Sequence, residues 1–255
     1  MGAVRIMTAN IWGDYFGNAV SPRDKQLLTV VERYTPLILG LQEATVSWHD
    51  STLLSYLRES YTVIGEAGNY VPLAVHGSCR ILADGYEPLI HTPDESKGIT
   101  WAVADTPEGR VAVCNTHFWW KTGEEHDAIR VENAHQLVAR MRALQQAYAC
   151  PVLAMGDMNC PLSAAVFSVY KQEGVQHLNA LAAQPSTVSS HHGNPVRGDD
   201  GLYHGCRTDN GNDCSIDHIL TLTDDVSVSA YCVVEDQEAL DATDHSPVYA
   251  DITIA

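Results

Sequence analysis

The sequence predicts a mixed α/β protein in which two packed β-sheets are covered by helices. Strand-like and helix-like hydrophobic patterns alternate along the 255-residue chain, and the many strands do not follow a regular parallel crossover order. A hydrophobic content of 45% with 5 Trp and 11 Tyr supplies a sizeable core, and no long low-complexity tract interrupts it. The length suits one large domain, so we expect a single domain over residues 1–255.

The first half of the chain is expected to hold most of the short strands. Apolar runs at residues 4–9 and 37–41 predict two buried strands, separated by an amphipathic helix over residues 23–34. A second helix is expected over residues 45–59. Further strands are expected at residues 61–64, 73–75, 80–82, 99–105 and 110–115. A turn at Pro107 to Gly109 joins the last two of them.

The second half begins with a long helix and ends with strands. Helical patterns cover residues 125–148 and 163–173, with a strand at 152–155 between them and Gly174 ending the second helix. Residues 184–212 are rich in Gly, Asp, His and Asn, which is typical of a long binding or gating loop. The remaining strands are expected at residues 215–222, 226–234 and 248–254.

The charge balance bears on the partner. The formal net charge is -17, and the 15 Lys and Arg residues form no cluster. A protein that grips an extended polyanion neutralises many phosphates with Lys and Arg, so long nucleic acid is disfavoured as the obligate ligand. A bound metal ion can nevertheless reverse the sign of the potential inside an acidic cleft.

Cysteine usage and hydropathy bear on the compartment. The seven cysteines include no CxxC pair, which favours neither a disulfide framework nor a zinc ribbon. Free thiols are expected, with pairing of Cys206 and Cys214 across a polar turn as the alternative. No basic segment followed by an apolar run opens the chain, and no apolar stretch approaches the roughly 20 residues of a membrane span. We expect a soluble, cytoplasmic protein without membrane insertion.

Polar residues of the kinds that bind metal or phosphate adjoin six of the apolar strands. Strands that share a sheet can bring such ends together at one edge and so form a pocket of convergent polar groups. Taken singly, each residue has an ordinary alternative role as a helix cap, a turn residue or a solvated side chain. The residues are Asn10, Glu43, His117, Asp157 with Asn159, Asp217, and Asp244 with His245.

The six clusters form an ordered set of motifs between residues 5 and 250. They are Thr8-Ala9-Asn10-Ile11-Trp12, Leu41-Gln42-Glu43, Asn115-Thr116-His117-Phe118, Gly156-Asp157-Met158-Asn159, Ser215-Ile216-Asp217-His218-Ile219 and Thr243-Asp244-His245-Ser246-Pro247-Val248. Each motif alone is weak, but the ordered set resembles the endonuclease/exonuclease/phosphatase superfamily of deoxyribonuclease I-like metal-dependent phosphoesterases. The resemblance implies a four-layer α/β sandwich of the α+β class, with two packed mixed β-sheets flanked by helices.

The resemblance also implies phosphoester hydrolysis with Mg²⁺ or Mn²⁺. Glu43 matches the principal metal ligand of the superfamily. Asn10 and Asp244 are expected to lie close enough to contribute directly or through water. Oxygen ligands with retained waters are what Mg²⁺ prefers.

Four further roles follow from the same matching. Asp157 matches the residue that orients or deprotonates the attacking water. His245, oriented by Asp217, would donate to the phosphoryl oxygens as negative charge shifts, and His117 would do similar work. Asn159 would hold either the substrate phosphate or the geometry of Asp157.

Two kinds of neighbouring side chain leave alternatives open. Trp119 and Trp120 follow His117 directly, so that either ring packs in the core or forms an apolar wall of the cleft. Arg23 either reaches a phosphate or starts the helix, and the helix start is favoured.

Three more histidines are expected outside the chemistry. His218 alternates to the strand face opposite Asp217, which predicts a structural role. His191 and His192 lie in the long loop, where solvated turn residues are expected.

These observations favour a metal-dependent phosphoester hydrolase that acts as a monomer on a small phosphorylated substrate such as a sugar phosphate, nucleotide or lipid head group. A nuclease or DNA-end-processing phosphodiesterase is the alternative enzyme. A catalytically silent binding module is the alternative outside enzymes, and the presence of every expected polar position disfavours it.

Overall fold

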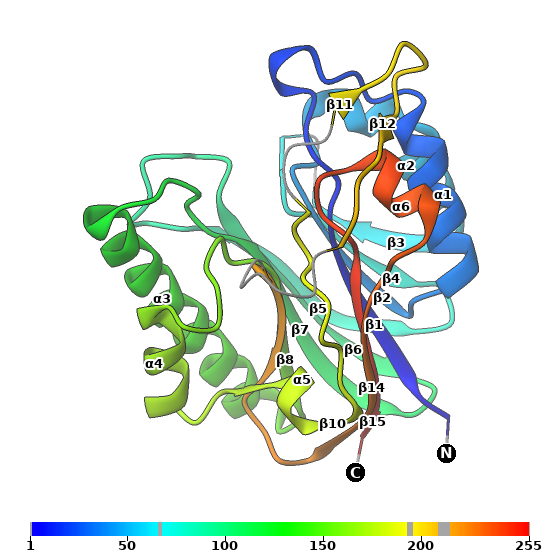
Figure 1. The fold of residues 1–255 in the computed structure, drawn as a ribbon. Coiled ribbons are helices and arrows are strands. Elements are labelled where there is room, and N and C mark those ends of the chain that lie inside the picture. The colour runs from blue at the N-terminus through cyan, green and yellow to red at the C-terminus, as the bar shows by residue number, and fades with distance from the viewer. Residues whose placement is uncertain (1, 66–67, 193–195, 209–214, 255) are drawn as a thin grey trace.

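The computed structural model describes residues 2–65, 68–192, 196–208 and 215–254. Two large mixed sheets pack face to face, and helices cover the outer face of each sheet (Figure 1). This is the predicted four-layer sandwich, so the fold class is confirmed.

The first sheet has seven strands in the order β10-β14-β15-β1-β2-β4-β3. Its outer face packs against three helices, α1 (Arg23–Tyr34), α2 (Thr52–Ser60) and α6 (Gln237–Ala242). Two short 3-10 turns, η1 (Tyr15–Gly17) and η2 (Val46–Asp50), lie in the connections. The strands are β1 (Val4–Asn10), β2 (Ile38–Gln42), β3 (Tyr61–Ile64), β4 (Leu73–His76), β10 (Ala182–Gln184), β14 (Val226–Val233) and β15 (Val248–Ile254).

The second sheet has six strands in the order β5-β6-β7-β8-β13-β9. The helices α3 (Glu124–Tyr148) and α4 (Ala165–Gln172) cover its outer face, and the short α5 (Leu178–Leu181) contributes Leu178 to the core between the sheets. The strands are β5 (Arg80–Pro88), β6 (Gly98–Thr106), β7 (Gly109–His117), β8 (Val152–Asp157), β9 (Gln176–His177) and β13 (Asp217–Thr221), and β11 (Val196–Arg197) and β12 (Tyr203–His204) form a separate two-stranded ribbon.

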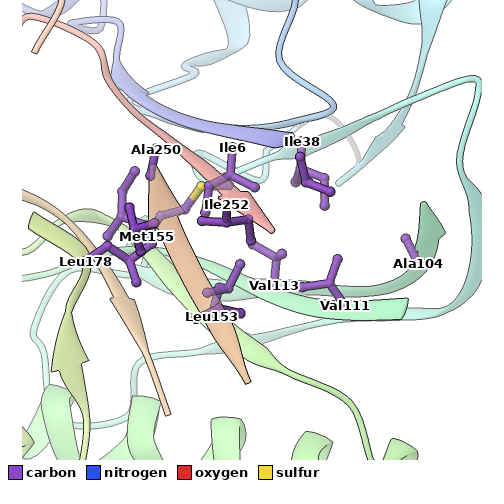
Figure 2. Close-up of a cluster of buried hydrophobic side chains, with 14 of the residues drawn as sticks. Ile6, Ile38, Ala104, Val111, Val113, Leu153, Met155, Leu178, Ala250 and Ile252 are labelled. Carbon is purple, nitrogen blue, oxygen red and sulfur yellow. The ribbon is translucent and has the colours of Figure 1, made fainter. Parts of the chain in front are cut away.

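The core between the sheets explains why the strands read as nearly continuous apolar runs. Along β1, Ile6 points into this core, whereas the next residue, Met7, packs against the helices on the outer face. A strand buried on both faces needs apolar residues at odd and even positions alike. Ile38, Val113 and Ile252 meet Ile6 in the same cluster (Figure 2).

One polar side chain bridges the two sheets within this apolar interior. Asn115 of β7 is fully buried. Its Nδ2 donates across to the first sheet and its adjoining loop, to the backbone carbonyl oxygens of Leu41, Val71 and Pro72 at 2.8–3.0 Å. Its Oδ1 accepts a 2.6 Å hydrogen bond from Gln42 Nε2. Because a buried amide loses its water, these bonds are satisfied in only one register of the two sheets.

Most predicted elements are present, with informative differences at their ends. The helix expected over residues 45–59 is divided into η2 and α2, because Ser51 takes an extended conformation and its Oγ caps α2 by accepting from Leu54 N. The strand expected at 80–82 extends to Pro88 as an edge strand with alternating exposure. The six-residue α6 was not predicted, since it is too short to show a helical period.

The described residues also bear on the membrane and thiol expectations. No described helix combines the length and apolarity needed to cross a lipid bilayer. Cys79, Cys114, Cys150, Cys160, Cys206 and Cys232 are free thiols. Cys214, the alternative partner of Cys206, lies outside the described residues.

His218 has the structural role expected of it. It is buried, with Nδ1 lying 3.0 Å from His177 Nε2 and Nε2 lying 2.8 Å from the carbonyl oxygen of Cys160. Burial, and secondarily His218, lowers the pKa of His177 to about 3. His177 is therefore neutral at physiological pH, and its contact with His218 joins β9 to β13.

We predict that Gly40→Ala destabilises the fold through Asn115. A Cβ at position 40 would lie 2.4 Å from Asn115 Oδ1, which is too close without displacing the bridge. The expected loss is about 2 kcal/mol of unfolding free energy, measured by urea denaturation. In a double-mutant cycle with Asn115→Ala, the cost of Gly40→Ala should shrink, because the clashing amide is gone. Strictly additive costs would contradict the bridge.

We also predict a loss of stability in acid that depends on His177. The unfolded chain protonates this histidine near pH 6.5, whereas the folded protein does so only near pH 3, so the unfolded state binds more protons between these values. Stability should therefore fall as pH decreases through this window, by up to about 1.4 kcal/mol per pH unit from this group. The His177→Gln variant should lose less stability than the parent between pH 7 and pH 5 in denaturant titrations, and an equal loss would contradict the assignment.

Candidate active site

The eight predicted residues converge at one edge of the sandwich. Parallel β1 and β2 end beside one another there, as do parallel β7 and β8, while antiparallel β13 and β15 begin there. Because an antiparallel strand starts where its neighbour ends, residues far apart in sequence meet at this edge. The residues brought together are Asn10, Glu43, His117, Asp157, Asn159, Asp217, Asp244 and His245.

Asp157 lies at the centre of this cluster and is buried. Its Oδ2 accepts a 2.9 Å hydrogen bond from Asn10 Nδ2 and lies 3.4 Å from His117 Nε2 and 3.9 Å from His245 Nε2. Its Oδ1 accepts from the backbone N–H of Asn159 at 2.8 Å. Burial raises the pKa of Asp157 above its ordinary value, and the neighbouring His245 opposes that rise. The carboxylate is thus a stronger base than an exposed aspartate.

Glu43 follows β2 in a strained backbone conformation. Its φ of 61° lies in the left-handed region, which non-glycine residues rarely adopt and which tends to occur at functional sites. Its Oε2 accepts from the backbone N–H of Gly13 at 2.9 Å, and its Oε1 lies 3.3 Å from Asn10 Nδ2. Asn10 therefore turns its amide NH₂ toward both Glu43 and Asp157, while its Oδ1 accepts from the backbone of Trp12 at 2.9 Å.

His245 is held as a cation by the carboxylates around it. Its Nδ1 lies 2.8 Å from Asp217 Oδ2, which also accepts a 2.7 Å hydrogen bond from Ser190 Oγ. Burial disfavours the cation, but Asp217, Asp244 and Asp157 outweigh burial and raise the pKa of His245 well above its ordinary value. Burial likewise opposes ionisation of Asp217, yet His245 outweighs it and lowers the pKa of Asp217. The imidazolium consequently presents Nε2–H to the centre of the site.

His117 is in the opposite state. The buried Lys97 places Nζ 3.0 Å from its Nδ1 and 3.1 Å from its Nε2. Burial, then Lys97 and then His245, hold the pKa of His117 well below its ordinary value. A neutral ring with Nδ1 accepting from Lys97 presents Nε2–H to Asp157, 3.4 Å away.

Asp244 offers a carboxylate on the other side of His245. It is buried, with Oδ1 at 3.5 Å from Thr243 Oγ1 and at 3.9 Å from His245 Nε2. Burial chiefly raises the pKa of Asp244 to about 6, and the charge of Glu43 adds to this rise while His245 opposes it. The negative charges of Glu43 and Asp244 repel each other in a site with little water, and a divalent cation between them would offset that repulsion. The two residues therefore fit a divalent cation.

His191 and His192 are packed against the site, so the expectation that they are solvated turn residues is wrong. The backbone of His191 bridges to His245, and the two rings lie 4.8 Å apart at an angle of 72°. His191 Nε2 also lies 3.9 Å from Asp244 Oδ2, and the ligand atoms of His191, Asp244 and His245 lie within 4.8 Å of one another. His192 donates its backbone N–H to the carbonyl oxygen of Asp244 at 3.1 Å.

Arg23 supports the site from behind. It is the first residue of α1, as the favoured interpretation holds, and its side chain is fully buried. The guanidinium donates to the carbonyl oxygens of Ile11, Trp12 and Ala242 at 2.8–3.0 Å. It therefore ties the segment after Asn10 to the segment before Asp244, and a buried cation engaged in this way is structural.

The two tryptophans after His117 have different surroundings. Trp119 is buried, and its Nε1 donates to His126 Nδ1 at 2.9 Å. Trp120 is 58% exposed and lines a cavity of about 820 Å³ that also borders Glu43 and Lys97. One ring thus belongs to the core and the other to the wall of a cleft.

Comparisons with known proteins identify the family and the fold. The model of the Endonuclease/Exonuclease/phosphatase family matches residues 7–245. An endonuclease/exonuclease/phosphatase from Bacteroides vulgatus has a TM-score of 0.80 at 19% identity, covering 100% of both chains. A mannosyl-6-phosphatase from Bacteroides thetaiotaomicron has a TM-score of 0.73 at 18% identity, covering 98% of this chain and 100% of that one.

A human structure shares the same fold. The catalytic domain of human Nocturnin, with a bound sulfate anion, has a TM-score of 0.74 at 15% identity and covers 99% of this chain and 95% of that one. No curated protein sequence matches the chain. At these identities the solved structures establish the fold, and the family model, which covers most of the chain, establishes the family. This chain belongs to the endonuclease/exonuclease/phosphatase family.

Proposed function

We propose that this protein hydrolyses a phosphoester bond of a small phosphorylated molecule with the help of Mg²⁺ or Mn²⁺. Members of its family are phosphoester hydrolases. The observation that carries the proposal is the arrangement around Asp157, where a buried carboxylate, a cationic His245 and a second pair of carboxylates, Glu43 and Asp244, share one edge of the sandwich.

Glu43 and Asp244 would hold the cation. Asn10, whose NH₂ donates toward Glu43 Oε1, fixes the position of that carboxylate and can contribute to the cation through water. When bound, a divalent cation polarises a phosphoryl oxygen and offsets the charge that develops on the leaving oxygen.

Asp157 would orient and deprotonate the attacking water. Its raised pKa makes it a stronger base, and Asn10 and Asn159 hold its two oxygens in place. Asn159 acts through its backbone N–H, while its side chain donates to the carbonyl oxygen of Phe118 at 3.1 Å. Of the two roles expected of Asn159, this geometry favours maintaining Asp157.

His245 would donate Nε2–H to a phosphoryl oxygen. Asp217 accepts from Nδ1 and keeps the ring charged and correctly turned, so that the donor is in place before negative charge develops. Ser190 fixes Asp217 in turn, because its Oγ donates to Asp217 Oδ2. His117 is neutral, and its Nε2–H would steady Asp157 or a phosphoryl oxygen beside it.

The charge of the chain supports a small substrate. With a net charge of -17 and 15 basic residues, the protein offers few groups to neutralise a long phosphate backbone. One structural neighbour is a mannosyl-6-phosphatase, which acts on a small phosphorylated compound by its name.

We predict that the purified protein releases phosphate from a panel of small phosphomonoesters only when Mg²⁺ or Mn²⁺ is present. Removal of the cation with EDTA should abolish this release, and Glu43→Gln should raise the Mn²⁺ concentration needed for half-maximal activity at least tenfold. Mn²⁺ binding measured by electron paramagnetic resonance should weaken in parallel. The exposed Asp84→Asn serves as the control. Salt-sensitive cleavage of single- or double-stranded DNA or RNA without phosphomonoesterase activity would instead establish a nuclease.

We further predict that Asp157→Asn and His245→Ala each lower kcat by about 10²- to 10⁴-fold, because a general base and a charged donor are lost. Asp217→Asn should cost less than His245→Ala, since the ring remains but is no longer held as a cation. Circular dichroism spectra and unfolding midpoints identify any variant that fails to fold. Near-native turnover by a folded Asp157→Asn protein would exclude the assigned role.

A further inference from the structure

A cavity of about 820 Å³ opens beside the proposed cation site. Glu43 and Lys97 border it, and its volume lies within the range of about 300–1,000 Å³ that is typical of small-molecule pockets. The rest of its lining is dominated by aromatic rings, those of Trp12, Tyr15, Phe16, Tyr70 and Trp120. A group attached to a phosphate at the site would have room to extend into this cavity.

Three of these rings are unusually exposed for apolar side chains. Phe16 is fully exposed, Trp120 is 58% exposed and Tyr15 is 41% exposed. Isolated apolar residues on a surface need no explanation, but several around one cavity mark a surface that binds something. The exposed rings are therefore available to stack on a flat apolar face of a ligand.

The segment that carries Tyr15 and Phe16 is held firmly. Asn18 Nδ2 donates to the carbonyl oxygen of Gly13 at 2.9 Å, and Thr45 Oγ1 donates to Asp14 Oδ1 at 2.6 Å. Phe16 itself has a φ of 55°, a left-handed conformation that costs free energy for a residue with a side chain. The backbone that carries this exposed ring is therefore fixed in place beside the cavity.

Trp120, another ring in the lining, also has neighbours that support it. The ring of the buried Trp119 lies 6.1 Å from it, and Lys121 Nζ lies 5.8 Å from its centroid. The two aromatic walls thus come from separate elements of the fold, each backed by its own contacts.

The charges around the cavity narrow the class of ligand. In the lining, the buried Lys97 and the cation proposed at Glu43 would repel a positively charged group such as a quaternary ammonium. At the rim, Asp94 and Glu95 would repel a second phosphate or a nucleic acid chain. A neutral group that presents hydroxyl donors to the carboxylates avoids both penalties.

Asp94 is placed to accept such donors. Its Oδ1 accepts from the backbone N–H of Ser96 at 2.9 Å, and its Oδ2 lies 3.8 Å from Lys97 Nζ. The side chain is 30% exposed, so it faces the cavity from a fixed turn.

We propose that this cavity binds the leaving group of the substrate and that the leaving group is a sugar. The C–H face of the sugar ring stacks on Phe16 and Trp120, and its hydroxyl groups donate to Asp94 and Glu95. This assignment rests on the proposed phosphoester hydrolysis and specifies its substrate class as a sugar phosphate.

The test compares a sugar phosphate with an ester that cannot reach the rings. Phosphate release is measured with Mn²⁺ from hexose 6-phosphates, phosphocholine, adenosine monophosphate and ethyl phosphate. The Phe16→Ala/Trp120→Ala protein should show kcat/KM for the preferred hexose phosphate reduced about tenfold or more, with ethyl phosphate changed less than about twofold. Trp120→Tyr should restore part of the loss contributed by Trp120→Ala. Ile90→Ala, at an exposed residue outside the cavity lining, should change neither substrate.

The outcomes separate this inference from the proposed function. If the parent protein prefers phosphocholine or adenosine monophosphate to every hexose phosphate, the sugar assignment is overturned while phosphoester hydrolysis stands. If the double variant loses ethyl phosphate and hexose phosphate hydrolysis equally, the rings support the site and not the leaving group, which also overturns the assignment. Failure of the parent protein to hydrolyse any of the esters would reject both.

Discussion

The hydrogen bonds that Asn115 makes across the two sheets set the geometry on which the site depends. Apolar contacts between sheets are non-directional and tolerate sliding, whereas an amide buried away from water must find its partners in one place. Asn115 Oδ1 accepts a hydrogen bond from Gln42 Nε2, and its Nδ2 donates to three backbone carbonyl oxygens of the facing layer. With the sheets fixed there, Asn10 of one sheet comes within 2.9 Å of Asp157 of the other.

The two histidines beside Asp157 have opposite charge states because their neighbours differ. His245 faces three carboxylates and is held as a cation, while His117 faces Lys97 and is held neutral. Burial lowers the pKa of both rings; the carboxylates reverse that effect at His245, whereas Lys97 adds to it at His117. The carboxylate between them accordingly has one neighbour that favours its charged form strongly and another that serves only as a hydrogen-bond donor.

Local pattern in the sequence predicted two helix-covered sheets, and it placed the candidate residues at the strand ends that the fold brings together. Apolar runs located most strands, and polar residues at the end of some strands and at the start of others marked the site edge, since strand direction determines which end a residue occupies. The sequence did not predict contacts that depend on pairing between distant segments. Lys97 lies beside His117 because β6 pairs with β7, with Ile99 opposite Thr116. His191 reaches His245 through a single bridge from a loop with no hydrophobic period. Neither contact can be predicted from a single sequence.

Arg23 anchors the chain on both sides of the segment that carries Phe16. Its guanidinium fastens the chain at Ile11 and Trp12 on one side and at Ala242 on the other, and its Nε bonds the carbonyl oxygen of Ala19. The aromatic segment around Phe16 is thus a loop clamped at both ends. Side chains between these two anchor points can be exchanged without displacing Asn10 or Asp244, so the wall of the cavity can change while the candidate site keeps its geometry.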